Sequence, residues 1–246
     1  MSCVKGTGRL GNQIIRTKAI SLLVEKYDLD ITYENYETIH ERLGINLPIG
    51  KKIYSSNIEI SEGNYQNYLE DVETISSNIQ ATDYGSFYQK PWILDRVYKR
   101  LNSEQEGVIA KNPFRERYKN NNDLFIHARI GDVSSGTPPL SYFENCIGRV
   151  SFDKLYIASD SFRHPIIEDI CKKYPEKVIL LEKDPVETIQ FASTCKNIVL
   201  TQGTFSGVIG CLSFFSENIF YPEEQIYQYC RHEIVARDSW TAVPLK

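Results

Sequence analysis

The chain has 246 residues, of which 41% are apolar and 12% aromatic, as expected for a globular protein with one large domain or two smaller ones. Its formal charge of −4 at pH 7 excludes a broadly basic surface, so we expect neither nucleic acid nor an anionic membrane as a general partner. No run approaches the ~18 consecutive apolar residues of a membrane span, and no basic segment followed by an apolar run opens the chain, so we expect a cytoplasmic protein without an integral membrane segment.

The chain begins with a strand, a glycine turn, a helix and a second strand. Residues 2–5 predict the first strand, and apolar residues at helical spacing predict a helix from Ile14 to about residue 28. Residues 29–33 predict the second strand. This succession is typical of the opening of a Rossmann-like domain.

The glycine turn allows two interpretations. Gly6, Gly8 and Gly11 match the dinucleotide fingerprint G-x-G-x-x-G, and Glu34 follows at the place where a carboxylate binds the ribose of NAD. One alternative function is therefore an NAD-binding oxidoreductase. The other interpretation is a tight turn that only lets the helix pack closely on the strand.

The pattern between residues 36 and 119 is weaker. Pro91 stands at the first turn of an expected amphipathic helix, and the polar stretch 115–123 is typical of a linker. We therefore expect an N-terminal domain over 1–118, a C-terminal domain over 119–222, and a segment 223–246 that packs back on the N-terminal domain. Short strands are expected around Ile58, Ile60, Tyr65, Tyr68, Ile75 and Ile79.

Residues 124–130 predict a strand with two different faces. Alternate positions from Leu124 to Ile130 are apolar, whereas His127 and Arg129 share the opposite face. They lie where the strand runs out into a loop, which is where open α/β sheets bind ligands, and an arginine there fits a phosphate. The alternative is a buried histidine beside a salt-bridging arginine.

The rest of the chain alternates strands and helices, which predicts a parallel sheet with both faces covered. The last of these strands, over residues 197–200, leads into a turn that delivers Thr204 and Ser206 to the start of an apolar helix. Hydroxyls and unbonded backbone N–H groups at a helix start favour an anion such as a diphosphate. The alternative is that one hydroxyl simply caps the helix.

Three peptides in this order resemble those of the GDP-fucose-dependent α-1,2- and α-1,6-fucosyltransferases. HARIGD at residues 127–132 resembles the family's H-x-R-R-x-D peptide, and TQGTFSG at 201–207 resembles its later peptide built around T-F-S or T-F-G. GRLGNQ at 8–13 resembles the G-R-x-G-N-Q opening of the α-1,2 group.

The resemblance implies an α/β fold of the GT-B type, with two Rossmann-like domains facing a cleft. The nucleotide sugar would be held by the C-terminal half and the acceptor largely by the N-terminal half. The residues that we expect to act in catalysis are Arg129, Asp132 and His127. The residues that we expect to bind the nucleotide sugar are Arg9, Asn12, Gln13, His127, Arg129, Asp160, Glu187, Thr204, Phe205 and Ser206.

The sequence also departs from the family pattern. Ile130 replaces the family's second arginine, so one of two positive charges near the leaving group is missing. Thr188, with Glu187 beside it, stands where the family often has an acidic side chain that recognises the base of the donor nucleotide. The stretch 207–210 lacks the tryptophans that commonly follow the T-F-S peptide in the α-1,2 group. These departures leave open which nucleotide sugar is the donor and which glycosidic linkage is formed.

The sequence thus predicts an inverting glycosyltransferase that moves a sugar, in the first place fucose from GDP-fucose, to a hydroxyl of a glycan in α-1,2 linkage. Asp132 is the first candidate for the general base and Asp160 the second. Because no D-x-D motif stands in a suitable context, we expect neither metal nor cofactor. The alternatives are another nucleotide-sugar donor, the NAD-binding oxidoreductase, and a nucleotide-sugar-binding protein without turnover.

Overall fold

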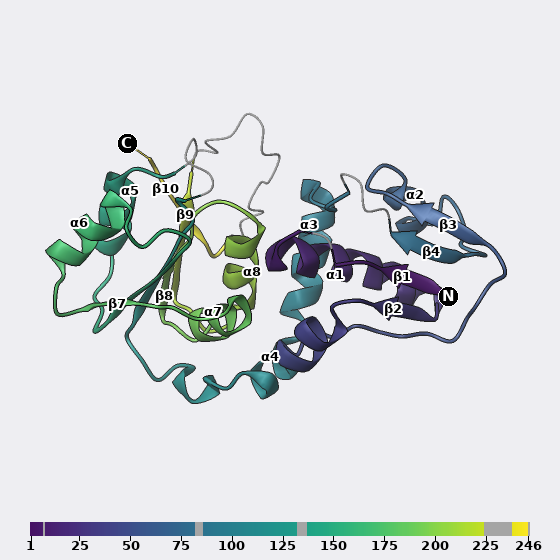
Figure 1. Cartoon of the computed structure of the whole chain (residues 1–246), viewed down its shortest axis with the longest axis horizontal. Coiled ribbons are helices and arrows are strands. Elements are labelled where there is room, and N and C mark those ends of the chain that lie inside the picture. Colours follow the sequence, from purple (N-terminus) through teal and green to yellow (C-terminus); the bar gives the residue numbers. More distant parts are fainter. Residues whose placement is uncertain (7, 82–85, 132–136, 224–237, 246) are drawn as a thin grey trace. The chain divides into compact units, whose positions relative to one another are not determined.

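The computed structural model of the chain describes residues 1–6, 8–81, 86–131, 137–223 and 238–245. The chain divides into two compact units, Met1–Lys111 and Asn112–Lys246, and each is built around one sheet (Figure 1). The division falls at residue 111, whereas the sequence placed the domain boundary at 118. No helix in the described ranges is both long enough and apolar enough to cross a membrane.

The first unit contains a four-stranded sheet in the order β2-β1-β4-β3, in which every pairing is parallel. Its strands are β1 (Ser2–Val4), β2 (Ile31–Tyr33), β3 (Asn57–Ile60) and β4 (Asn78–Ala81). Its helices are α1 (Leu10–Tyr27), a π-helix (Glu37–Arg42), α2 (Tyr65–Leu69), α3 (Pro91–Asn102) and α4 (Gln105–Lys111).

The sequence anticipated most of this unit. The strand, turn, helix and strand at the start are confirmed, and Pro91 opens α3. Helix α1 begins at Leu10, earlier than the expected Ile14, so its first turn carries the polar residues that follow the glycine turn. The expectation of a strand around Tyr65 and Tyr68 is wrong, because both lie in α2, where Tyr65 is buried and its hydroxyl donates to the Ala19 carbonyl at 2.6 Å.

The second unit contains a six-stranded parallel sheet in the order β10-β9-β8-β5-β6-β7. Its strands are β5 (Leu124–Ala128), β6 (Leu155–Ser159), β7 (Val178–Leu180), β8 (Asn197–Val199), β9 (Asn218–Pro222) and β10 (Thr241–Val243). Its helices are a 3-10 helix (Arg115–Arg117), α5 (Leu140–Ile147), α6 (Pro165–Lys173), α7 (Pro185–Ala192) and α8 (Thr204–Leu212).

This strand order determines where a ligand can bind. From β5 the chain moves outward to β6 and β7, and it then returns to β8 on the other side of β5 and moves outward again. This is the Rossmann order, in which the connections from β5 and β8 leave in opposite directions. The crevice outside the carboxyl ends of these two strands is therefore the expected binding place.

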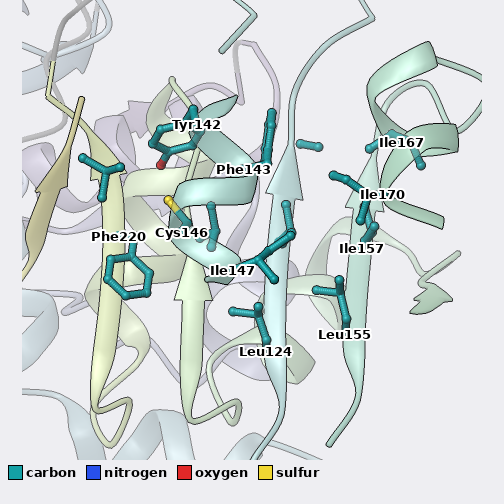
Figure 2. Packing of buried hydrophobic residues seen from close by; sticks show 14 of the residues in the cluster. Leu124, Tyr142, Phe143, Cys146, Ile147, Leu155, Ile157, Ile167, Ile170 and Phe220 are labelled. Carbon is teal, nitrogen blue, oxygen red and sulfur yellow. The ribbon is translucent and has the colours of Figure 1, made fainter. Parts of the chain in front are cut away.

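The apolar core of the second unit lies between the sheet and the helices α5 and α6, and Figure 2 shows their side chains meeting. Helices α7 and α8 cover the other face of the sheet (Figure 1). The strand residues of this core include Leu124, Ile126 and Ala128, which is the face that the two-residue period predicted to be apolar.

The expectation of a linker at the start of the second unit is wrong. The stretch 115–123 is not a free linker: the Arg117 Nη2 atom lies 2.7 Å from Asp123 Oδ2, and the guanidinium carbon lies 4.4 Å from the centre of the Phe191 ring. These contacts fasten the stretch to the second unit. Strand β10 pairs in parallel with β9, so residues 241–243 lie in the second sheet. Residues 224–237, most of the segment that was expected to pack on the N-terminal domain, lie outside the described residues.

The core predicts a large loss of stability when Phe143 is truncated. Phe143 on α5 is fully buried, so Phe143→Ala should lower the free energy of unfolding of the second unit by about 3–5 kcal/mol. Because Trp240 lies in the second unit, its fluorescence during urea unfolding in a Trp92→Phe background isolates this unit. Phe143→Leu is the matched control and should lose less than half as much; equal losses would contradict the packing in Figure 2.

Candidate functional site

Strand β5 places His127 against helix α8. The side chain projects from the face opposite the core, as the sequence predicted, and its Nδ1 atom lies 2.6 Å from the Ser206 hydroxyl. The imidazole also lies against the Phe205 ring, with 5.1 Å between the ring centres. Ser206 is fully buried, so its hydroxyl fixes the histidine, whereas Phe205 is partly exposed.

Burial determines the charge of His127. The side chain is buried, and the loss of hydration lowers its pKa to about 4. Asp160 opposes this lowering and Arg129 adds to it. His127 is therefore neutral at pH 7, so it serves the site as a hydrogen-bonding group and not as a cation.

The start of α8 needs a glycine at position 203. Gly203 precedes the helix with φ 97° and ψ 162°, a conformation that is essentially restricted to glycine. A Cβ atom at this position would also lie 2.8 Å from Nη1 of Arg129, so the guanidinium lies directly against this backbone. No side chain caps the helix, and Thr204 in its first turn is partly exposed.

These features make the carboxyl ends of β5 and β8 suited to an anion. The Arg129 guanidinium and the uncapped amino end of α8 lie together, and both favour negative charge. The Arg129 backbone N–H donates to the Thr201 hydroxyl at 3.1 Å, which ties the end of β5 to the turn after β8. Thr201 and Gly203 were quoted from the sequence but not assigned to the site, and a glycine directly before a helix is the signal that could have found Gly203.

Asp160 holds the loop that leaves β5. Its Oδ1 atom accepts hydrogen bonds from the backbone N–H groups of Ile130 at 2.8 Å and Gly131 at 2.9 Å. The carboxylate of this candidate base therefore already has backbone partners at the strand end. Asp132, the first candidate for the base, lies outside the described residues.

Glu187 lies in the first turn of α7. Its carboxylate is 3.7 Å from Lys183 Nζ, and its backbone N–H donates to the carboxylate of Asp184, which caps the helix. The neighbouring Thr188 is buried, and its hydroxyl donates to the Lys183 carbonyl at 3.4 Å. Among the described residues, no group of three or more His, Cys, Asp or Glu side chains could hold a metal ion.

The three remaining candidates, Arg9, Asn12 and Gln13, lie in the first unit at the start of α1. Arg9 is the exposed residue before the helix, and the Gln13 side-chain amide donates to the Gly8 carbonyl at 2.6 Å. The Asn12 amide oxygen accepts a hydrogen bond from the Gln89 side chain at 2.9 Å. The sequence had given Gln89 no role.

The glycine turn in the first unit is held by Glu34. Its Oε2 atom accepts a hydrogen bond from the Gly6 backbone N–H at 2.8 Å. This contact gives Glu34 a role within the turn itself, and it supports the interpretation in which the glycines allow close packing of helix and strand. The NAD-binding interpretation had required the same carboxylate for a ribose.

Gly203→Ala should damage the site while leaving the fold intact. The new methyl group must displace the Arg129 guanidinium, and the backbone must leave its glycine-only conformation. We expect a lower melting temperature and a loss of affinity for nucleoside diphosphates of roughly tenfold or more, measured by calorimetry. Gly63→Ala is the control, because the nearest atom to its added Cβ lies at an ordinary 3.5 Å; an unchanged affinity in Gly203→Ala would contradict the site.

The low pKa of His127 predicts a specific loss of stability in acid. Between pH 6.5 and pH 4 the unfolded chain binds a proton at this residue and the folded chain does not, so lowering the pH favours unfolding. From pH 7 to pH 5 the free energy of unfolding should fall by about 2 kcal/mol more in the natural chain than in His127→Gln. Urea unfolding at both pH values measures this difference. An equal fall in His127→Gln would contradict a neutral buried histidine.

The chain is similar to solved glycosyltransferase structures. For the fucosyltransferase NodZ from Bradyrhizobium the TM-score is 0.52 with 10% identity, over 89% of this chain and 93% of that one. For FUT1 from Arabidopsis thaliana, solved with GDP, the TM-score is 0.47 with 13% identity, over 86% of this chain and 67% of that one. For the heptosyltransferase WaaC from E. coli, solved with ADP, the TM-score is 0.46 with 10% identity, over 91% of this chain and 88% of that one.

At these identities the likeness shows the fold. No family model matches the chain, and a comparison with curated proteins gives no match. The prediction of an α/β fold of the GT-B type is confirmed by the two parallel sheets together with the likeness to NodZ.

Proposed function

We propose that the protein is a nucleotide-sugar-dependent glycosyltransferase, with GDP-fucose as the first candidate donor and a glycan hydroxyl as the acceptor. The observation that carries the proposal is the Arg129 guanidinium against the uncapped amino end of α8, between the carboxyl ends of β5 and β8. This is the place where a Rossmann-like sheet binds a nucleotide, and its charge suits a diphosphate. The fold and the three family-like peptides support the same proposal.

The charge on the leaving diphosphate would be neutralised mainly by Arg129 and the first turn of α8. Ile130, which replaces the family's second arginine, is buried in the apolar core of the second unit. Its side chain therefore serves packing and adds nothing to the anion site. Backbone N–H groups and one guanidinium can stabilise the departing charge without a metal, and we propose that the reaction needs none.

We propose a direct displacement with inversion at the anomeric carbon. The acceptor oxygen forms the new bond to this carbon while the bond to the diphosphate oxygen breaks, and a carboxylate takes the hydroxyl proton. Asp132 remains the first candidate for this base, since Asp160 already accepts two backbone hydrogen bonds through Oδ1. Neutral His127, fixed by Ser206, would bind the nucleotide by hydrogen bonding and ring contact.

Thr188 and Glu187 on α7 stand where the family often recognises the nucleotide's base. Thr188 is buried and bonded within α7's own turn, and Glu187 is paired with Lys183. Neither the buried Thr188 hydroxyl nor the ion pair of Glu187 restricts the nucleotide's base to guanine. The donor therefore has to be found by comparing nucleotides, and a uridine or thymidine diphosphate sugar is the main alternative.

A thermal-shift comparison of GDP, UDP, dTDP, CMP and NAD, with and without the attached sugars and in the presence of EDTA, tests the proposal. Saturation at 100 times the dissociation constant adds roughly 2.7 kcal/mol to stability, so a selective rise with GDP and GDP-fucose is expected. A rise only with another nucleoside diphosphate would overturn the donor, and a rise only with NAD would overturn the proposal.

Arg129→Ala separates the phosphate contact from general stability. Losing a guanidinium bonded to a diphosphate should weaken binding of the selected nucleotide by roughly 10- to 100-fold. Arg149→Ala, which removes an exposed arginine of the same unit, should bind as the natural chain does. Hydrolysis or transfer of the bound sugar should likewise fall in Arg129→Ala and persist in EDTA. Nucleotide-sugar binding without any turnover in the natural chain would identify a binding protein instead of an enzyme.

A further inference from the structure

The second unit has a cavity of about 460 Å³ at the amino ends of its strands. It lies beside the residues that lead into β5, β8 and β9, which are neighbours in the sheet. Because Arg129 follows the carboxyl end of β5, the cavity and the anion site lie at opposite edges of the same sheet. The cavity is lined by Lys119, Asn121, Lys196, Phe214, Phe215 and Ser216, among others. Cavities of this volume bind small molecules.

Solvent reaches the groups that could contact a ligand in this cavity. The Lys119 side chain is exposed, and Lys196 and the two phenylalanines, Phe214 and Phe215, are partly exposed. The cavity therefore presents two ammonium groups and two aromatic rings to anything that enters it.

The neutral polar groups of the lining are already bonded within the protein. The Asn121 amide donates to the Thr194 carbonyl at 2.9 Å and accepts from the Lys196 backbone N–H at 3.3 Å. The Ser216 hydroxyl donates to the Cys195 carbonyl at 2.6 Å. A sugar needs many hydrogen bonds in place of those to water, and this lining offers few. The cavity is therefore poorly suited to a polyhydroxylated ligand.

Lys119 and Phe215 form a fixed pair on one wall. The Lys119 backbone has φ 59°, in the left-handed region that a lysine rarely adopts, and its Nζ atom lies 4.2 Å from the centre of the Phe215 ring. Tyr118 meets this ring edge to face at 5.4 Å, and its hydroxyl accepts a hydrogen bond from the Asn112 amide at 2.9 Å. The ring that carries the ammonium group is thus held from behind.

The two lysines of the cavity differ in charge compensation. Lys196 Nζ lies 3.3 Å from the carboxylate of Glu217. For Lys119, no carboxylate in the described part of the chain lies within ion-pair distance. The cavity therefore carries one uncompensated positive charge beside aromatic rings, which suits a ligand with one negative charge and a flat apolar body.

We infer that this cavity binds a small aromatic carboxylate. The carboxylate pairs with the Lys119 ammonium group, and the aromatic ring of the ligand packs against Phe214 and Phe215. This site is separate from the nucleotide site, and the inference does not rest on the proposed glycosyl transfer.

The test is calorimetry of the full chain with naphthalene-2-carboxylate as the probe. The uncharged naphthalene-2-carboxamide has the same rings and should bind at least tenfold more weakly. Lys119→Met keeps the apolar stem and removes the charge, so it should weaken carboxylate binding by roughly tenfold, whereas Lys119→Arg should retain it. Lys154→Met, which changes an exposed lysine of the same unit outside the cavity, is the matched control and should bind normally.

Chemical labelling places the probe within the molecule. Naphthalene-2-carboxylate should slow the acetylation of Lys119 by acetic anhydride but not that of Lys154, as read by mass spectrometry. GDP should not displace the probe, because the anion site lies at the other edge of the sheet. No binding, equal binding of the carboxamide, equal binding by Lys119→Met, or displacement by GDP would each overturn the inference and leave the proposed function untouched.

Discussion

The second unit depends on the alternation of side chains along β5. Leu124, Ile126 and Ala128 turn toward α5 and α6 and complete the core, while His127 meets α8 on the other face. The strand thereby completes the core with one face and places His127 against α8 with the other. Because β5 lies at the centre of the sheet, between β6 and β8, both contributions are fixed by hydrogen bonds on both of its sides.

The two units present different chemistry at their glycine-containing turns. In the second unit the Arg129 guanidinium and the start of α8 lie against Gly203, and the nearby His127 is kept neutral by burial. In the first unit, amides and an aromatic ring meet beside Gly8. The turn in the second unit therefore presents a cation and a helix start, whereas the turn in the first unit presents neutral amides and an aromatic ring.

Local pattern was sufficient to predict the alternation of β5 and the order of strands and helices from β5 to α8, although it placed Thr204 in the turn before α8 and not in its first turn. Contacts between distant residues were not visible in it. The stretch 115–123 is polar by composition, yet Arg117 pairs with Asp123 and packs on Phe191, 74 residues further along the chain than Arg117. The exclusion of Ser206 from the surface and the unpartnered oxygen of Gln89 likewise depend on burial, which only tertiary packing creates.

The two-faced strand also limits how this chain can change. Substitutions at single positions of β5 alter one face at a time, whereas inserting or deleting one residue between Leu124 and Arg129 would exchange the faces, turning the core residues toward α8 and His127 into the apolar layer. Such a change cannot be compensated by adjusting a neighbouring side chain. The spacing from the start of the strand to the arginine is therefore under stricter constraint than the identity of most residues within it.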